Sequence, residues 1–165
     1  MNNIILIGMP GSGKSTVGVL LAKALGYSFT DTDLIISRRA GKPLQRILDD
    51  DGLQGFLALE RQVGEALVCD HTVVATGGSM VLSDPAMARL KQTGRVVYLS
   101  VPFEEISRRV TNIKTRGIAF HKNETLADVY RDRVPLYEKY ADINVSVNPS
   151  DSIEETVDSL VDILL

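Results

Sequence analysis

The sequence predicts a single α/β domain of three layers, in which a parallel sheet lies between two layers of helices. Short apolar runs rich in β-branched residues alternate with segments of helical periodicity, which is typical of a parallel sheet covered on both faces. A glycine-rich loop joins the first run to a helical segment. The 165 residues, of which 44% are hydrophobic, suit one domain with a sizeable core, because no linker or low-complexity tract divides them.

The expected strands and helices follow one another in regular order. The expected strands are the apolar runs at residues 3–7, 28–31, 72–75, 95–100 and 143–147, the second being the weakest. The expected helices span residues 14–25, 33–40, 43–69, 84–92, 103–110, 125–140 and 152–164, with a break in the third near Gly52. Ligands of such sheets bind beyond the carboxyl ends of the strands, so the residues directly after each run are candidates for the site.

Residues 8–15 read GMPGSGKS and form a complete phosphate-binding loop between an apolar strand and an amphipathic helix. The glycines of the loop allow backbone conformations that point N–H groups at phosphate oxygens, and the helix N-terminus adds its positive dipole end. Lys14 would reach the β and γ phosphates, and Ser15 would bind Mg²⁺. We therefore expect ATP or GTP to be bound by Gly11, Ser12, Gly13, Lys14, Ser15 and Thr16.

The composition limits the other partners of the chain. The 18 basic and 21 acidic residues give a net charge of −3. The chain has no basic cluster and few aromatic residues, which argues against nucleic acid as a partner. No apolar stretch approaches the roughly 20 residues of a membrane span. The single cysteine, Cys69, has an apolar context and is expected to be packed rather than catalytic. We expect a cytoplasmic monomer that acts on a small molecule.

The region after the fourth strand separates the classes of nucleotide-binding protein. A GTP switch normally has an NKxD-type guanine signature after a late strand, whereas here Ser100 is followed by Val101, Pro102 and Phe103. The short chain also argues against a motor protein. Phosphoryl transfer to a small molecule is therefore the favoured chemistry.

The remaining motifs resemble those of the shikimate kinase family, whose members phosphorylate a ring hydroxyl with Mg-ATP. Beside GMPGSGKST, the chain has DTD at 31–33, ATGG at 75–78, RVPLYEKYAD at 133–142, NPSDS at 148–152 and two arginines, Arg109 and Arg116, at the family's spacing. The resemblance covers nearly the full length, and the combination is more specific than any one motif. It implies a P-loop kinase sheet of five strands in the order 2-3-1-4-5, with an acceptor-binding region at about residues 32–61 and a short lid at about residues 111–124.

The resemblance also implies roles in the reaction. Asp33 would bind substrate hydroxyls and accept the proton of the attacking one, while Asp31 and Ser15 would hold Mg²⁺. Lys14 and the lid residue Arg116 would stabilise charge on the transferred phosphate. The alternative for Asp33 is a helix N-cap, and both roles could coexist.

Two further groups of residues match binding positions of the family. The implied acceptor-binding residues are Asp33, Glu60, Gly77, Gly78 and Arg133. The implied adenine-binding residues are Arg109, Asn148 and Pro149. For Arg109 the alternative is a solvated helix face shared with Arg108, and for Arg133 it is a surface charge beside Arg131.

The chain departs from the family mainly on the acceptor side. The family segment FRxxE reads FLALE, so Leu57 replaces the substrate arginine although Glu60 is kept. Ser79 replaces a third glycine, Leu53 replaces a common acidic residue, and the lid segment RPL reads RGI at residues 116–118. Loss of one charged hydrogen bond lowers affinity by roughly 1.5–3 kcal/mol, or about tenfold to a hundredfold.

One compensation for Leu57 is conceivable from the helical spacing. Arg61 follows Leu57 by one turn and could supply a guanidinium, unless it is solvated or paired with Glu65.

The sequence thus predicts an ATP-dependent kinase with shikimate as the expected acceptor. The alternatives are a kinase of another polyol or hydroxy acid, and a noncatalytic ATP-binding regulator.

Overall fold

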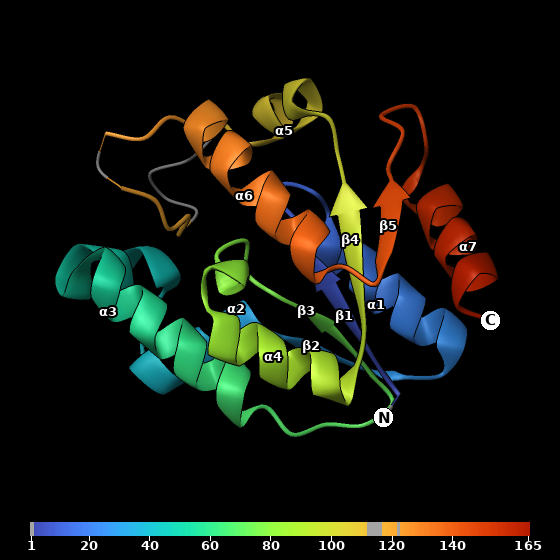
Figure 1. Ribbon diagram of the computed structural model, residues 1–165, viewed down its shortest axis with the longest axis horizontal. Coiled ribbons are helices and arrows are strands. Elements are labelled where there is room, and N and C mark those ends of the chain that lie inside the picture. The colour runs from blue at the N-terminus through green and yellow to red at the C-terminus, as the bar shows by residue number, and fades with distance from the viewer. Residues whose placement is uncertain (1, 112–116, 122) are drawn as a thin grey trace.

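The computed structural model describes residues 2–111, 117–121 and 123–165, and within them a parallel sheet is flanked by helices on both faces (Figure 1). The strands lie in the order β2-β3-β1-β4-β5, which confirms the expected order. Their bounds are β1 (Asn3–Ile7), β2 (Ser28–Asp31), β3 (Thr72–Ala75), β4 (Gly94–Ser100) and β5 (Ile143–Ser146). The phosphate-binding loop follows β1, the central strand, and therefore lies at the middle of the carboxyl edge.

The helices form the outer two layers. Their bounds are α1 (Lys14–Leu25), α2 (Thr32–Ala40), α3 (Leu44–Ala66), α4 (Asp84–Thr93), α5 (Phe103–Arg109), α6 (Leu126–Tyr140) and α7 (Ile153–Leu164). Helix α1 packs on the sheet together with α7, whereas α4 and α6 contact the sheet on its other face and α3 packs against α4 (Figure 1). The expected three-layer α/β/α architecture is confirmed.

The burial of the central strands explains why they form the centre of the sheet. All five residues of β1 are buried, and its Ile5 lies opposite Val74 of β3 and Val96 of β4. The edge strands β2 and β5 are only partly buried. A continuous apolar run suits a strand covered on both faces, and a mixed run suits an edge strand.

Some differences from the expected element bounds have a capping explanation, whereas the helix expected over residues 43–69 spans only Leu44–Ala66, because Leu67 is extended. The helices expected to begin at Thr125 and Ser152 begin one residue later, because each of these residues is the N-cap of a capping box. The expected break in α3 is present at Gly52, whose φ of 74° lies outside the helical region. The short 3₁₀ helix η1 (Met80–Leu82) was not expected from the sequence.

The apolar core is divided into two clusters. The main cluster surrounds the sheet and contains β1, β3 and β4 with the inner faces of the helices. A smaller cluster joins α2 and α3 to the segment before α6, and its buried members are Ile36, Ile47, Phe56, Val63 and Ala119. The residues expected to bind the acceptor therefore lie between two separately packed apolar regions. Among the described helices, none is both long enough and apolar enough to cross a membrane.

Candidate functional site

The phosphate-binding loop has the geometry expected from its sequence. Gly11 and Gly13 have φ values of 83° and 90°, which a residue with a side chain rarely adopts. No side chain caps the N-terminus of α1 at Gly13, so the first N–H groups of this helix remain available to an anion. Lys14 is 7% exposed, and its Nζ donates to the carbonyls of Gly8 and Met9, each at 2.8 Å. The loop thus combines a buried cation with a helix N-terminus.

Ser15 and Asp31 form a polar pair at the edge of the loop. The Ser15 hydroxyl donates to Asp31 Oδ2 at 2.7 Å, although the two residues lie on α1 and β2. A hydroxyl and a carboxylate held together beside a phosphate-binding loop fit Mg²⁺, which prefers oxygen ligands and shares them with nucleotide phosphates. The expected magnesium-binding residues are therefore adjacent in the structure.

Asp33 faces the site, and the N-cap role that was considered for Asp33 is taken by Asp31. Helix α2 begins at Thr32, and Asp31 is its N-cap, since Asp31 Oδ1 accepts from the Asp33 backbone N–H at 2.9 Å. The alternative assignment of Asp33 as the N-cap is wrong. Burial, followed by the charge of Asp31, raises the pKa of Asp33 to about 6, while Lys14 lowers it. A carboxylate with a pKa near neutrality is suited to accept a proton.

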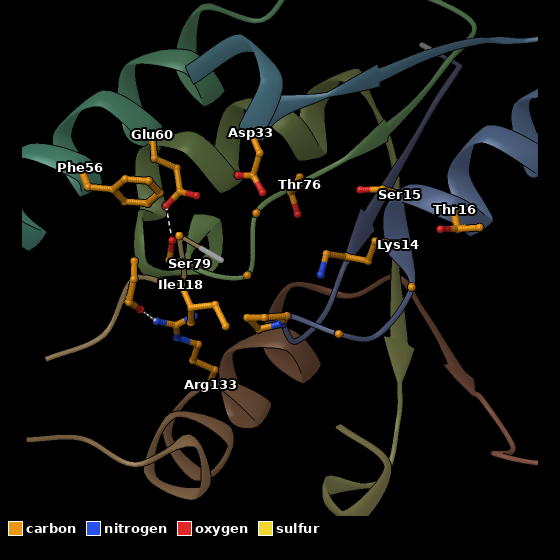
Figure 2. Close-up of a pocket in the computed structure, with 17 residues that line it drawn as sticks. Lys14, Ser15, Thr16, Asp33, Phe56, Glu60, Thr76, Ser79, Ile118 and Arg133 are labelled. Carbon is orange, nitrogen blue, oxygen red and sulfur yellow. Dashed lines mark hydrogen bonds between the residues drawn. The ribbon is translucent and has the colours of Figure 1, made fainter. Parts of the chain in front are cut away.

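One cavity of about 170 Å³ connects the phosphate-binding loop with the expected acceptor residues (Figure 2). Lys14, Ser15 and Thr16 line one side of it, and Glu60, Ser79 and Arg133 line the other (Figure 2). Its remaining lining residues are Pro10, Gly11, Gly13, Asp33, Phe56, Thr76, Gly77, Gly78, Gly117, Ile118 and Ala119. The cavity can therefore place a small acceptor next to the terminal phosphate of a nucleotide.

Glu60 supplies a second carboxyl group to the cavity. It is 2% exposed, and its Oε1 accepts a hydrogen bond of 2.6 Å from the Ser79 hydroxyl. Burial raises the pKa of Glu60 to about 7, while the Ser79 hydrogen bond acts in the opposite direction. A Cβ added at Gly77 would lie 2.7 Å from Glu60 Oε2 and 2.6 Å from Asp33 Oδ1. The absence of a side chain at Gly77 therefore leaves a small space that two carboxyl groups face.

Arg133 brings a guanidinium to the same cavity from α6. It is 4% exposed and donates to the carbonyl of Ala119 (Figure 2), so its assignment as a surface charge is wrong. Its neighbour Arg131 is the exposed arginine and pairs with Asp128. Helix α6 also fixes the loop after β3, because the Tyr137 hydroxyl donates to the Gly78 carbonyl at 2.6 Å. The position of Arg133 fits a group that binds a carboxylate.

Neither Leu57 nor Arg61 contributes a side chain to the cavity. Leu57 is half-buried and packs against the smaller apolar cluster. Arg61 is exposed and forms an ion pair with Glu65, with 2.8 Å between Nε and Oε1. Arg61 therefore does not replace the family arginine in this structure, since its helical position turns it away from the space beside Glu60.

The expected adenine side is a second hollow of about 350 Å³, next to the outer surface of the loop. Arg109 lines it, donates to the Gly11 carbonyl at 3.1 Å, and pairs with Glu105 at 2.9 Å. It is thus anchored rather than part of a solvated face; Arg108 is the exposed neighbour. Hydrogen bonds from Arg108 and Arg109 hold the pKa of Glu105 well below its usual range, at about 2.

The turn after β5 only partly matches the expectation for this hollow. Asn148 and Pro149 are exposed and are not among its lining residues, whereas the flanking Val147 and Asp151 are. Asn148 instead orders the turn, because its Oδ1 accepts from the backbone N–H of Ser150 at 3.0 Å. The roles expected for Asn148 and Pro149 in binding adenine remain predictions.

Several site residues were missed by the sequence reasoning, and one lies outside the described residues. Phe56 is 1% exposed and lines the cavity, and its place directly before Leu57 in the FLALE segment could have indicated it. Ile118 was also missed, whereas Thr76 and Ser79 lie in the segment after β3 that was expected to face the site, and all three line the cavity. Arg116 and five other residues of the expected lid fall outside the described residues, so the lid and its arginine remain predictions.

Comparisons with known proteins agree with this geometry. A family model described as shikimate kinase matches residues 10–164. The shikimate kinase of Thermobifida fusca (strain YX) is 42% identical over 146 residues, or 87% of this chain and 84% of that protein. That of Pseudomonas entomophila (strain L48) is 38% identical over 151 residues, or 90% and 88%. Among solved structures, shikimate kinase from Acinetobacter baumannii in complex with shikimate has a TM-score of 0.91 and 33% identity, and covers 99% of this chain and 93% of that one. The chain described here belongs to the shikimate kinase family.

Proposed function

We propose that this chain transfers the γ-phosphoryl group of ATP to a hydroxyl group of shikimate, giving ADP and shikimate 3-phosphate. The observation that carries the proposal is a cavity in which a phosphate-binding loop faces the half-buried carboxyl of Asp33, the buried carboxyl of Glu60 and the buried guanidinium of Arg133. Shikimate combines several hydroxyl groups with one carboxylate, so its chemistry matches that lining. Family membership supports the same activity.

The proposed division of labour follows from where the side chains lie. Lys14 binds the terminal phosphates at the head of α1 and stabilises the charge of the transferred group. Asp33 accepts the proton of the attacking hydroxyl, and its pKa of about 6 leaves it mostly ionised at neutral pH. Arg133 binds the acceptor carboxylate and so orients the ring.

Ser15 and Asp31 are the residues proposed to hold magnesium. The ion, when bound with the nucleotide, neutralises charge on the phosphate oxygens. The 2.7 Å hydrogen bond from Ser15 Oγ holds Asp31 Oδ2 next to Ser15, which lines the phosphate end of the cavity. Arg109 is proposed to lie against the adenine, because it lines the hollow beside the loop and is held there by Glu105.

The test is coupled ADP release by the purified protein with Mg-ATP, with and without millimolar shikimate. We expect ADP release to depend on shikimate, and Arg61→Ala to serve as a matched variant with unchanged rates, since Arg61 is exposed and outside the cavity. ATP binding without shikimate-dependent ADP release would contradict the proposal and would direct the search to other hydroxylated metabolites.

We also propose that the chain acts as a cytoplasmic monomer of one domain with residues 111–124 as its lid, and without a nucleic-acid partner. Its net charge of −3 gives no general attraction for nucleic acid. Light scattering at micromolar concentration measures the mass directly. A dimer mass would contradict the monomer proposal and leave the proposed activity untouched.

A further inference from the structure

The Glu60 carboxyl is held in an asymmetric way. Its Oε1 accepts the short hydrogen bond from Ser79, whereas Oε2 is buried and has no hydrogen-bond partner among the residues that the structure describes. Oε2 points toward Asp33 and the bare Cα of Gly77 (Figure 2). A buried carboxylate oxygen without a donor is costly, so a donor from a bound molecule would be favoured there.

Ser79 lies on a turn whose backbone is held by several hydrogen bonds. It is 5% exposed, and the η1 turn fixes its backbone, because the Leu82 N–H donates to the Ser79 carbonyl at 3.0 Å and the Met80 N–H donates to the Gly77 carbonyl at 3.1 Å. The Tyr137 hydroxyl holds the adjacent Gly78 carbonyl. The Glu60 carboxyl is therefore hydrogen-bonded to a buried hydroxyl on a turn whose backbone is fixed.

We propose that Ser79 is a positioning residue of the acceptor site: it orients Glu60 so that Oε2, together with Asp33 Oδ1, accepts hydrogen bonds from hydroxyl groups of the acceptor above Gly77. The ligand class is a small polyhydroxylated molecule, and the proposal rests on the proposed function. Among the described residues, the hydrogen-bond donor of Glu60 is thus the neutral hydroxyl of Ser79, while Leu57 packs in the smaller apolar cluster.

The charged groups around Glu60 give this arrangement a characteristic pH dependence. Asp33 raises the pKa of Glu60, whereas Arg133 and Lys14 lower this pKa. The Ser79 hydrogen bond also lowers the pKa, and its effect is larger than that of any of the three charges. Removal of the Ser79 hydroxyl should therefore move the ionisation of Glu60 to higher pH.

The experiment compares the shikimate kinetics of the wild type with those of Ser79→Ala, Glu60→Ala and the double variant. Arg61→Ala is the control, since Arg61 lies on α3 next to Glu60. We expect Ser79→Ala to raise KM for shikimate about tenfold and to leave KM for ATP within about twofold. In the Glu60→Ala background the Ser79 substitution should change KM by less than about twofold, because the group through which it acts is gone. An equal effect in both backgrounds would mean that Ser79 touches the acceptor itself, and an unchanged KM in Ser79→Ala would mean that it has no role; either result overturns the proposal.

The pH profile provides a second measurement that does not need a Glu60 variant to fold. The acid limb of kcat/KM for shikimate should lie at higher pH in Ser79→Ala than in the wild type and should not move in Arg61→Ala. If the acid limb of Ser79→Ala lies at the same pH as that of the wild type, the proposal is overturned. If the wild type does not turn over shikimate, the proposed function fails instead, so the two failures are distinguishable.

Discussion

Glu60→Gln should make the protein more stable at alkaline pH while weakening its acceptor site. Burial is the main reason that the pKa of Glu60 rises from 4.5 to about 7, so the folded state binds this proton more tightly than the unfolded state does. The free energy of unfolding must then fall as the pH rises from about 4.5 to about 7. At about 1.4 kcal/mol per pKa unit, ionisation of Glu60 costs the folded protein about 3 kcal/mol above pH 7.

A glutamine keeps the shape and can still accept from Ser79, but it does not ionise. The difference in unfolding free energy between Glu60→Gln and the wild type should therefore grow by about 3 kcal/mol between pH 4.5 and pH 8. Urea denaturation without ligand at these two pH values measures it. Glu65→Gln is the matched control, since Glu65 lies on the same helix with 38% of its side chain exposed and loses only a surface ion pair. A difference that is the same at both pH values would refute the reasoning.

Three further substitutions test the proposed roles separately. Asp33→Asn should reduce turnover by at least about a hundredfold with ATP affinity retained, as isothermal titration and ADP release can show, because the proton acceptor is lost but the phosphate loop is intact. Arg133→Ala should raise KM for shikimate about tenfold to a hundredfold in steady-state assays; an unchanged KM would remove Arg133 from the acceptor site. Gly77→Ala should abolish shikimate binding in fluorescence titration, because its Cβ would lie 2.6 Å from Asp33 Oδ1 and 2.7 Å from Glu60 Oε2; retained affinity would show that this space is not used.

The sequence was sufficient to predict the phosphate-binding part of the site. Contiguous residues carry that part: one strand, one glycine-rich loop and one helix N-terminus bring Lys14 and Ser15 to their places with little help from the rest of the fold. Asp31 ends β2, whose carboxyl end lies at the same edge of the parallel sheet as the loop although β3 lies between β2 and β1, and the structure places its carboxylate 2.7 Å from Ser15 Oγ. Local chemistry and sheet topology were enough here.

The acceptor half could be predicted only in part, because it depends on the rotation of α3 about its axis. Leu57 and Arg61 are one turn apart, and spacing alone could not tell whether either faces the cavity. The packing of the smaller cluster decides the rotation: it buries Phe56 and directs Glu60 inward, which leaves Arg61 exposed beside Glu65. The hydrogen bond between Ser79 and Glu60 joins residues 19 positions apart and has no signature in either segment.

The division of the core into two clusters has a consequence for how enzymes of this shape can diversify. The wall of the acceptor site belongs to the small cluster around Phe56, whereas the phosphate-binding loop is built on the large one around β1. A change of side chain on α3 alters the volume of a few neighbours and leaves the nucleotide machinery undisturbed. Single substitutions, such as the one at Leu57, can therefore change the acceptor side of such a kinase while the phosphate-binding residues keep their arrangement.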